Sequence, residues 1–183
     1  MLRTSAAMRA GIHPRTLYAM RDKGVIEQVS RGLYRLTDLP PLTNPDLVTV
    51  AAKVPRGVIC LISALVFHDI TLQIPHAVHI ALPRGNERPR LPYPPIRVFS
   101  FSGRSFTEGI ETHKVDGLEL QIYSVEKTLA DCFKFRNKIG FDVALEALKF
   151  YRIRKRLKVD DLMKFCRICR VEKVLLPYLE ALL

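Results

Sequence analysis

The alternation of hydrophobic and polar positions near the start of the chain predicts a helix around residue 17. Leu17 and Met20 lie three residues apart, share one face of such a helix and would pack inward. Pro14 opens the helix at a position where its missing N–H costs no hydrogen bond. Gly24 ends it, because glycine adopts the left-handed conformation of a helix C-terminus without strain.

The same pattern predicts a shorter helix before this one and a hairpin after it. Thr4 or Ser5 is expected to cap the shorter helix with a side-chain oxygen, and Gly11 closes it. Residues 25–29 and 33–36 favour strands, and they are joined by the turn Ser30-Arg31-Gly32. Helix, turn, helix and hairpin in this order predict a winged helix-turn-helix, a DNA-binding module.

The outward face of the second helix is polar and basic, which suits the DNA major groove. An arginine at the tip of the hairpin, Arg31, would reach a neighbouring phosphate or the minor groove. A small helix pair followed by a hairpin needs no DNA partner, so compactness, order and charge together favour the DNA-binding interpretation. The side chains that point away from the helix core are Arg15, Tyr18 and Ala19, with Thr16, Arg21 and Lys23 beside them.

Beyond this segment the pattern predicts a second domain. Residues 37–43 include Pro40-Pro41 and form a stiff linker, which places the domains at residues 1–40 and 41–183. Residues 58–123 read as a small mixed sheet with helices against it, and the remainder as helices. The expected fold class is α+β, with a winged helix-turn-helix followed by a mixed α/β domain whose C-terminal third is helical.

The charge of the chain supports a polyanionic partner. The net charge is +11, and it is concentrated in residues 1–40 and 127–183 on either side of a neutral middle. The densest basic run is residues 152–158, which is a candidate patch for phosphate or nucleic acid; a solvated helix end is the other interpretation. Its basic side chains are Arg152, Arg154, Lys155, Arg156 and Lys158.

The sequence favours a soluble, cytoplasmic protein without a cofactor. It begins with no apolar signal segment, and its longest apolar run is too short to span a membrane. The four cysteines suit reduced core thiols. Cys166 and Cys169 have CxxC spacing, but two further ligands at matching spacing are absent, so no metal site is expected.

Two arrangements could carry catalysis, and neither is favoured. Ser124 and Lys127 match the S-x-x-K spacing of acylating serine enzymes, yet Ser124 is well explained as a helix cap. Asp116 and Glu119 could hold a magnesium ion as in a nuclease, yet Asp116-Gly117 is a hairpin turn. We therefore expect no enzyme and no catalytic residue.

Several segments in order resemble the AbiEi antitoxin family, and the likeness extends over nearly the whole chain. The segments are Ala10-Gly11-Ile12-His13-Pro14-Arg15-Thr16-Leu17-Tyr18, Arg31-Gly32-Leu33-Tyr34, Pro55-Arg56-Gly57-Val58-Ile59-Cys60-Leu61, Ile74-Pro75-His76 and Glu126-Lys127-Thr128-Leu129-Ala130-Asp131-Cys132-Phe133-Lys134-Phe135-Arg136-Asn137.

The resemblance implies an antitoxin of a type IV toxin–antitoxin system, of the kind linked to abortive infection. An N-terminal winged helix would repress its own operon by binding promoter DNA, with two protomers on a repeat. A C-terminal domain would counter a nucleotidyltransferase-like toxin without a stable complex. Carried onto this sequence, the DNA contacts are Arg15, Thr16, Tyr18, Arg21 and, at the wing, Arg31.

The chain departs from the family pattern at two points. His13 stands where a serine-type cap is expected, which would weaken or move the cap. The helix that normally precedes Arg3 is lacking, so Leu17, Met20 and Leu33 would lose a packing partner unless another segment covers them. The alternatives to a repressor and antitoxin are a metal-dependent, nuclease-like enzyme and an RNA-binding module that acts through residues 152–158.

Overall fold

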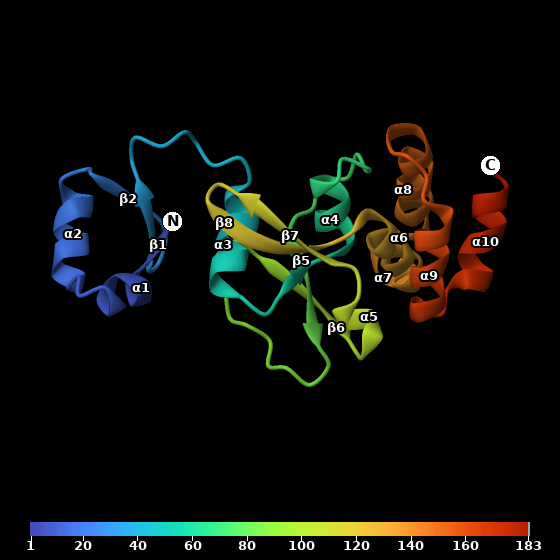
Figure 1. The fold of residues 1–183 in the computed structure, drawn as a ribbon, viewed down its shortest axis with the longest axis horizontal. Coiled ribbons are helices and arrows are strands. Elements are labelled where there is room, and N and C mark those ends of the chain that lie inside the picture. The colour runs from blue at the N-terminus through green and yellow to red at the C-terminus, as the bar shows by residue number, and fades with distance from the viewer. Residues whose placement is uncertain (183) are drawn as a thin grey trace. The chain divides into compact units, whose positions relative to one another are not determined.

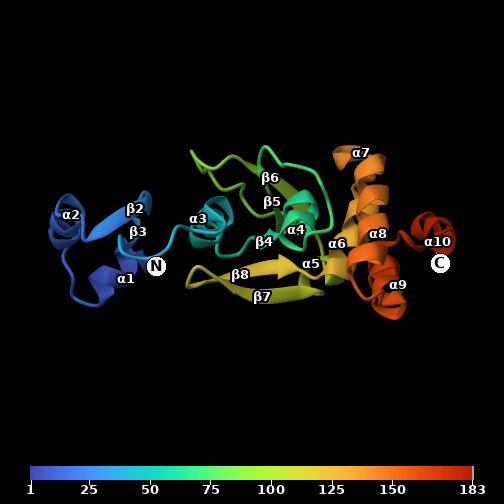
Figure 2. The ribbon, with the colours of Figure 1, turned by 90° about the horizontal axis from the view of Figure 1, so that it is seen from above.

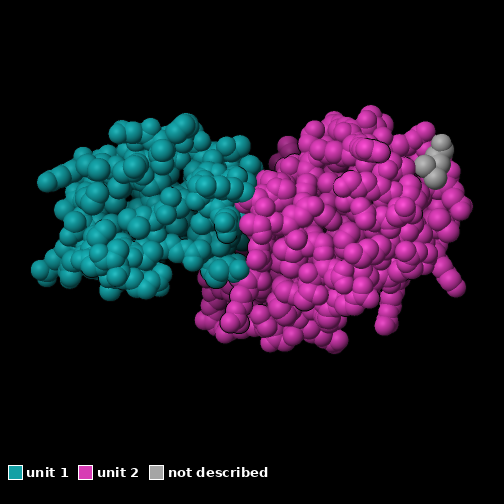
Figure 3. Space-filling model, viewed as in Figure 1, with its two compact units in different colours: residues 1–55, 114–120 teal, residues 56–113, 121–183 magenta. Residues whose placement is uncertain are grey.

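The fold is mixed α/β. The computed structural model describes residues 1–182, and this part of the chain holds ten helices and two sheets (Figure 1). Residues 1–55 and 114–120 form one compact unit, and residues 56–113 form a second one with the chain from residue 121 onward (Figure 3). The domain boundary between residues 40 and 41 stays a prediction.

The first unit builds its own small core around a three-stranded sheet in the order β1-β3-β2, with both pairings antiparallel. Its buried cluster comprises Ala7, Leu17, Ile26 and Tyr34. The elements are β1 (Leu2–Arg3), α1 (Thr4–Arg9), α2 (Pro14–Asp22), β2 (Ile26–Ser30), β3 (Leu33–Leu36) and α3 (Pro45–Lys53).

The ends of α1 and α2 follow the glycines, but the start of α1 does not follow its hydroxyl residues. Gly11 and Gly24 have φ angles of 81° and 71°, as expected for residues that close helices. The predicted cap by Thr4 or Ser5 is wrong, because α1 begins at Thr4 without a side-chain cap. Instead the Thr4 N–H donates to the carbonyl of Gly32 at 3.0 Å, so the hairpin supplies the acceptor.

The expected loss of packing in this unit does not occur. Leu17 and Leu33 are each 1% exposed. Strand β1 pairs with β3, Leu2 opposite Tyr34, and Leu2 packs against the buried cluster. The two-residue strand β1 thus contributes Leu2 to the packing around Leu17.

The second sheet has the order β6-β5-β4-β8-β7. Strand β5 is parallel to β6 and antiparallel to β4, and β4 is parallel to β8 (Figure 2). Asp116 and Gly117 have φ angles of 50° and 77°, which confirms the predicted turn between β7 and β8. The strands are β4 (Val58–Ile59), β5 (Val78–Pro83), β6 (Ile96–Phe101), β7 (Ile110–Val115) and β8 (Leu118–Tyr123).

The helices of the second unit surround α6, which packs against α4, α8 and α9. Most of α6 is buried, including Lys127 and Asp131. Within residues 1–182, every helix is too short or too polar to cross a membrane. These helices are α4 (Leu61–Phe67), α5 (Arg104–Thr107), α6 (Val125–Lys134), α7 (Arg136–Ile139), α8 (Phe141–Arg154), α9 (Val159–Cys169) and α10 (Glu172–Glu180).

Candidate nucleic-acid interface

Helix α2 carries most of the residues predicted to contact DNA, and His13 fixes where it starts. His13 is the N-cap residue, and its Nδ1 accepts a hydrogen bond from the Arg15 N–H at 3.2 Å. Pro14 follows at the first helical position, where it needs no hydrogen bond. The expectation that the cap would move is therefore wrong, because the His13 Nδ1 accepts the bond in place of a hydroxyl oxygen, whereas a weaker cap stays a prediction.

The outer face of α2 is open to solvent. Leu17 of α2 is buried, whereas Tyr18 is 46% exposed. The exposed side chains along this face are Arg15, Thr16, Tyr18, Ala19 and Arg21. Four of the five predicted DNA contacts are thus exposed on one helix.

The guanidinium of Arg21 contacts two neighbouring side chains of α2. Its Nη2 lies 2.8 Å from Asp22 Oδ1, and its guanidinium carbon lies 5.5 Å from the centre of the Tyr18 ring. The hydrogen bond and charge of Asp22 raise the pKa of Arg21 above its ordinary value. An incoming phosphate would compete with the Asp22 carboxylate for this cation.

The fifth predicted contact, Arg31, lies at the turn between β2 and β3. Its side chain is exposed, and Gly32 completes the turn with a φ of 74°. The Arg31 carbonyl accepts a hydrogen bond from Lys53 Nζ of α3. The backbone of the hairpin tip is thereby attached to the same unit while the Arg31 guanidinium faces solvent.

A second arginine of the hairpin, Arg35, has a structural role that the sequence did not reveal. It is 6% exposed, and its Nε lies 2.6 Å from Glu27 Oε1 on the neighbouring strand. Its Nη2 donates to the carbonyl of Leu39 at 2.6 Å. Arg35 therefore connects β3 to β2 and to the linker, and is buried away from any nucleic acid.

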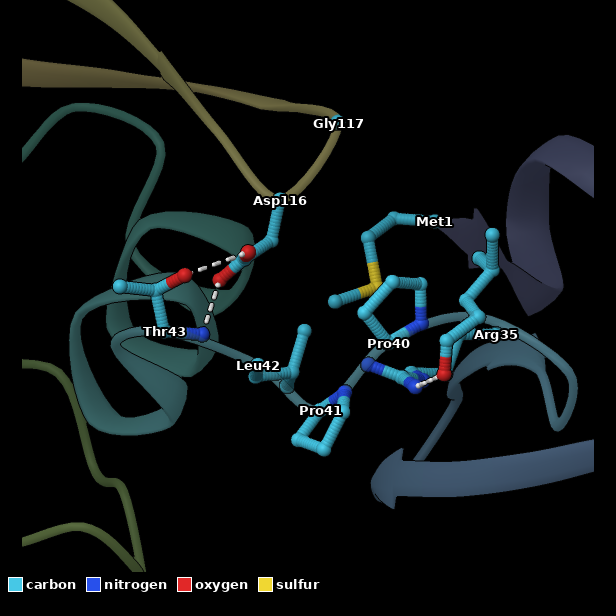
Figure 4. A pocket seen from close by; sticks show the side chains of 9 residues that line it. Met1, Arg35, Pro40, Pro41, Leu42, Thr43, Asp116 and Gly117 are labelled. Carbon is cyan, nitrogen blue, oxygen red and sulfur yellow. Dashed lines mark hydrogen bonds between the residues drawn. The ribbon is translucent and has the colours of Figure 1, made fainter.

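The linker is bound at both ends around a pocket of about 290 Å³ (Figure 4). Arg35 binds Leu39, while the Asp116 carboxylate accepts hydrogen bonds from the N–H and hydroxyl of Thr43 at 3.0 and 3.2 Å. Asp116, considered above as a metal ligand with Glu119, is thus occupied by the linker. The pocket is lined by Met1, Arg35, Leu39, Pro40, Pro41, Leu42, Thr43, Asp116 and Gly117.

The predicted phosphate patch lies in the other unit, where α8 ends. Arg154 Nη1 lies 2.8 Å from Asp69 Oδ1, and its guanidinium stacks 4.3 Å from the centre of the Phe150 ring. The remaining basic side chains of the run are exposed: Arg152, Lys155, Arg156 and Lys158. Four cations are therefore available to a polyanion, and Arg154 serves to hold the loop that follows α4.

The residues considered for catalysis have structural partners. Ser124 Oγ accepts a hydrogen bond from the backbone N–H of Lys127 at 3.3 Å, as a helix cap does, and the Lys127 ammonium is bound to Asp131.

Burial raises the pKa of Cys166 and of Cys169 to about 12, so both thiols stay protonated.

The N-terminal segment of the chain matches a known protein family model. A family model described as "Transcriptional regulator, AbiEi antitoxin" matches residues 1–37, the segment from β1 to the residue after β3. No curated protein matches the chain. The match supports a role as a transcriptional regulator or antitoxin, and it covers the helix and hairpin that carry the predicted DNA contacts.

Proposed function

We propose that this chain is a transcriptional autorepressor and the antitoxin of a type IV toxin–antitoxin operon. The observation that carries the proposal is that Arg15, Thr16, Tyr18 and Arg21 are all exposed on α2, and that Arg31 is exposed at the hairpin tip. In this interpretation the first unit is a winged helix-turn-helix, with α2 in the major groove and the β2–β3 hairpin as the wing. The match over residues 1–37 supports the same assignment.

The proposed mode of binding uses two kinds of contact. Arg15 lies in the first turn of α2 and carries no ion pair within residues 1–182, so it is the side chain best suited to a bidentate contact with guanine. Arg31 would contact phosphate at the wing and position the helix. We propose two protomers on a DNA repeat, because a dimer doubles the otherwise small contact surface of a single recognition helix.

A mobility-shift titration on the DNA upstream of the gene tests this assignment. Arg15→Ala should cost about 1–3 kcal/mol of binding and relax base preference, whereas Arg31→Ala should weaken binding to all sequences and lower the salt slope by about 1. Lys173→Ala, an exposed position in the other unit, is the charge-matched control. Unchanged binding by both the Arg15 and Arg31 variants would reject the assignment.

The antitoxin part of the proposal concerns the second unit. We propose that it counters a nucleotidyltransferase-like toxin without catalysing a reaction itself and without a stable complex. The exposed run on residues 152–158 supports an alternative in which the chain shields an RNA that the toxin attacks. Reversing charge at Arg152, Lys155 and Arg156 separates the two: loss of growth protection with intact promoter binding supports RNA shielding.

A further inference from the structure

The connection between β5 and β6 is a long loop. The two strands are parallel, and residues 84–95 join them without a helix or strand. Arg84 donates its N–H to the carbonyl of Phe101, while Val78 donates to the carbonyl of Pro95, so the loop runs the full length of the strand pair. At about 3.3 Å per residue, this length is roughly 20 Å.

Figure 1 shows the course of this loop in green. Its arginine side chains are exposed. Arg84, Arg88 and Arg90 all face solvent, with Glu87 as the one acidic residue among residues 84–95. Within residues 1–182 the ion pairs of arginine involve none of these three; they involve Arg21, Arg35, Arg104, Arg154 and Arg167. An open cavity of about 390 Å³ lies between Arg88 and Arg90, lined also by Glu87 and Pro89.

The basic surface continues past the loop onto the edge of the sheet. Strand β6 is an edge strand, and Arg97 on it is exposed. Arg97 Nη2 donates to the carbonyl of Lys138 at 2.9 Å, which places the C-terminal end of α7 beside the start of β6. Basic side chains on an edge strand also prevent strand-to-strand aggregation, but that role does not account for the exposed aromatic ring in the preceding loop.

That ring is Tyr93, which is 68% exposed. The next residue, Pro94, is buried. An exposed aromatic ring in the same loop as several exposed arginines is a combination with which proteins bind single-stranded nucleic acid: the cations contact phosphates and the ring stacks on an unpaired base. Bases in a duplex are already stacked, so the ring favours a single strand over double-stranded DNA.

We propose that Arg88, Arg90, Tyr93 and Arg97 form a second nucleic-acid site, which binds single-stranded RNA or DNA through phosphates and a stacked base without reading its sequence. None of its residues belongs to α2 or to the run at residues 152–158. It extends the proposed function, because a promoter reader of duplex DNA has no use for a stacking surface.

Fluorescence anisotropy on the full chain tests the site with three labelled probes: a 20-nucleotide oligouridine RNA, a 20-nucleotide oligothymidine DNA and a 20-base-pair duplex of unrelated sequence. Arg88→Gln/Arg90→Gln should weaken binding of both single strands by about 10-fold or more and reduce the salt slope by roughly 1.4, at about 0.7 per phosphate contact. Lys149→Gln/Lys173→Gln removes the same charge from exposed positions on α8 and α10 and should change neither value.

Variants of Tyr93 test the stacking contact, which the charge variants do not test. Tyr93→Ala should weaken both single strands about 5- to 10-fold and leave the duplex unchanged, and Tyr93→Phe should restore binding. Tighter binding of one single-stranded probe identifies RNA or DNA as the preferred strand. The proposal is overturned if the loop variant matches its control or if Tyr93→Ala weakens the duplex equally. Arg15→Ala should leave single-strand binding intact, so failure of promoter binding is recognised separately.

Discussion

Lys127 Nζ donates a hydrogen bond to Asp131 Oδ2 one helical turn away, and neither side chain is exposed to solvent. The ammonium also lies 4.1 Å from the centre of the Tyr123 ring, and the second carboxylate oxygen accepts from Cys169 Sγ at 3.2 Å. Burial raises the pKa of Asp131, and the Lys127 ammonium opposes this by stabilising the carboxylate. Each charge is tolerated inside the second unit because the other is present.

Removing one member of this pair should therefore be more harmful than removing both. Lys127→Met leaves a buried carboxylate without a counterion and should lower the free energy of unfolding by about 3–5 kcal/mol. Lys127→Met/Asp131→Leu should recover much of that loss. Urea denaturation measures both, with exposed Lys149→Met as a control that stays within about 0.5 kcal/mol. Equal destabilisation by the single and double variants would contradict this account.

The His13 cap yields a prediction about the start of α2. His13→Ala removes the acceptor for the Arg15 N–H and should destabilise the first unit by about 1 kcal/mol, while His13→Ser keeps an acceptor and should preserve stability. Ser5→Ala is the informative comparison, because Ser5 makes no cap bond and should change little. Thermal unfolding followed by circular dichroism distinguishes these variants, and equal effects at residues 5 and 13 would rule out the cap.

The ion pair between Arg21 and Asp22 should restrain DNA binding. Asp22→Asn frees the guanidinium and removes a negative charge close to the expected phosphate. Because exposed ion pairs are weak, promoter binding should tighten only about 1.5- to 5-fold, and less at high salt. Asp38→Asn removes the same charge from an exposed linker position and serves as control in the mobility-shift titration. An equal gain from both variants would point to net charge alone.

His79 on β5 should make the second unit sensitive to mild acid. Its ring is buried against Phe99, and burial, with Arg97 nearby, lowers its pKa from 6.5 to about 4. The folded state therefore binds the proton less readily than the unfolded chain does. This contribution to stability is fully present above pH 6.5 and is lost as the pH falls toward 4, with a limit of about 3 kcal/mol.

Denaturation across that pH range checks the effect. His79→Phe should flatten the loss of stability between pH 6.5 and 4, and His76→Gln, at an exposed histidine, should leave it unchanged. An unaltered slope in the His79 variant would assign the acid sensitivity to other groups.

Elements whose determinants are close in sequence could be predicted well. The turn at Asp116-Gly117 was predicted where the structure has it, between β7 and β8, because the two residues that form it are contiguous. Helix α2 was likewise predicted from Pro14 and Gly24.

Features that depend on contacts between residues far apart in the sequence could not be predicted from it. Strand β1 is two residues long and exists because β3 pairs with it. Helix α6 has an amphipathic pattern, yet Glu126 is also buried, because Tyr151, 25 residues further on, donates a hydrogen bond to its carboxylate at 2.8 Å. The attachment of the linker by Arg35 and Asp116 has the same origin, since residue types alone do not reveal which backbone groups they will contact.

The four cysteines have a consequence for experiments on the molecule. Cys60, Cys132, Cys166 and Cys169 are all buried, and burial raises the pKa of each thiol. Because the thiolate is the reactive species, alkylating reagents at neutral pH should leave the native chain unmodified. A cysteine introduced at the exposed hairpin tip would then be the preferred point for attaching a fluorophore. The natural chain thus already serves as a background for site-specific labelling of the surface that we assign to DNA.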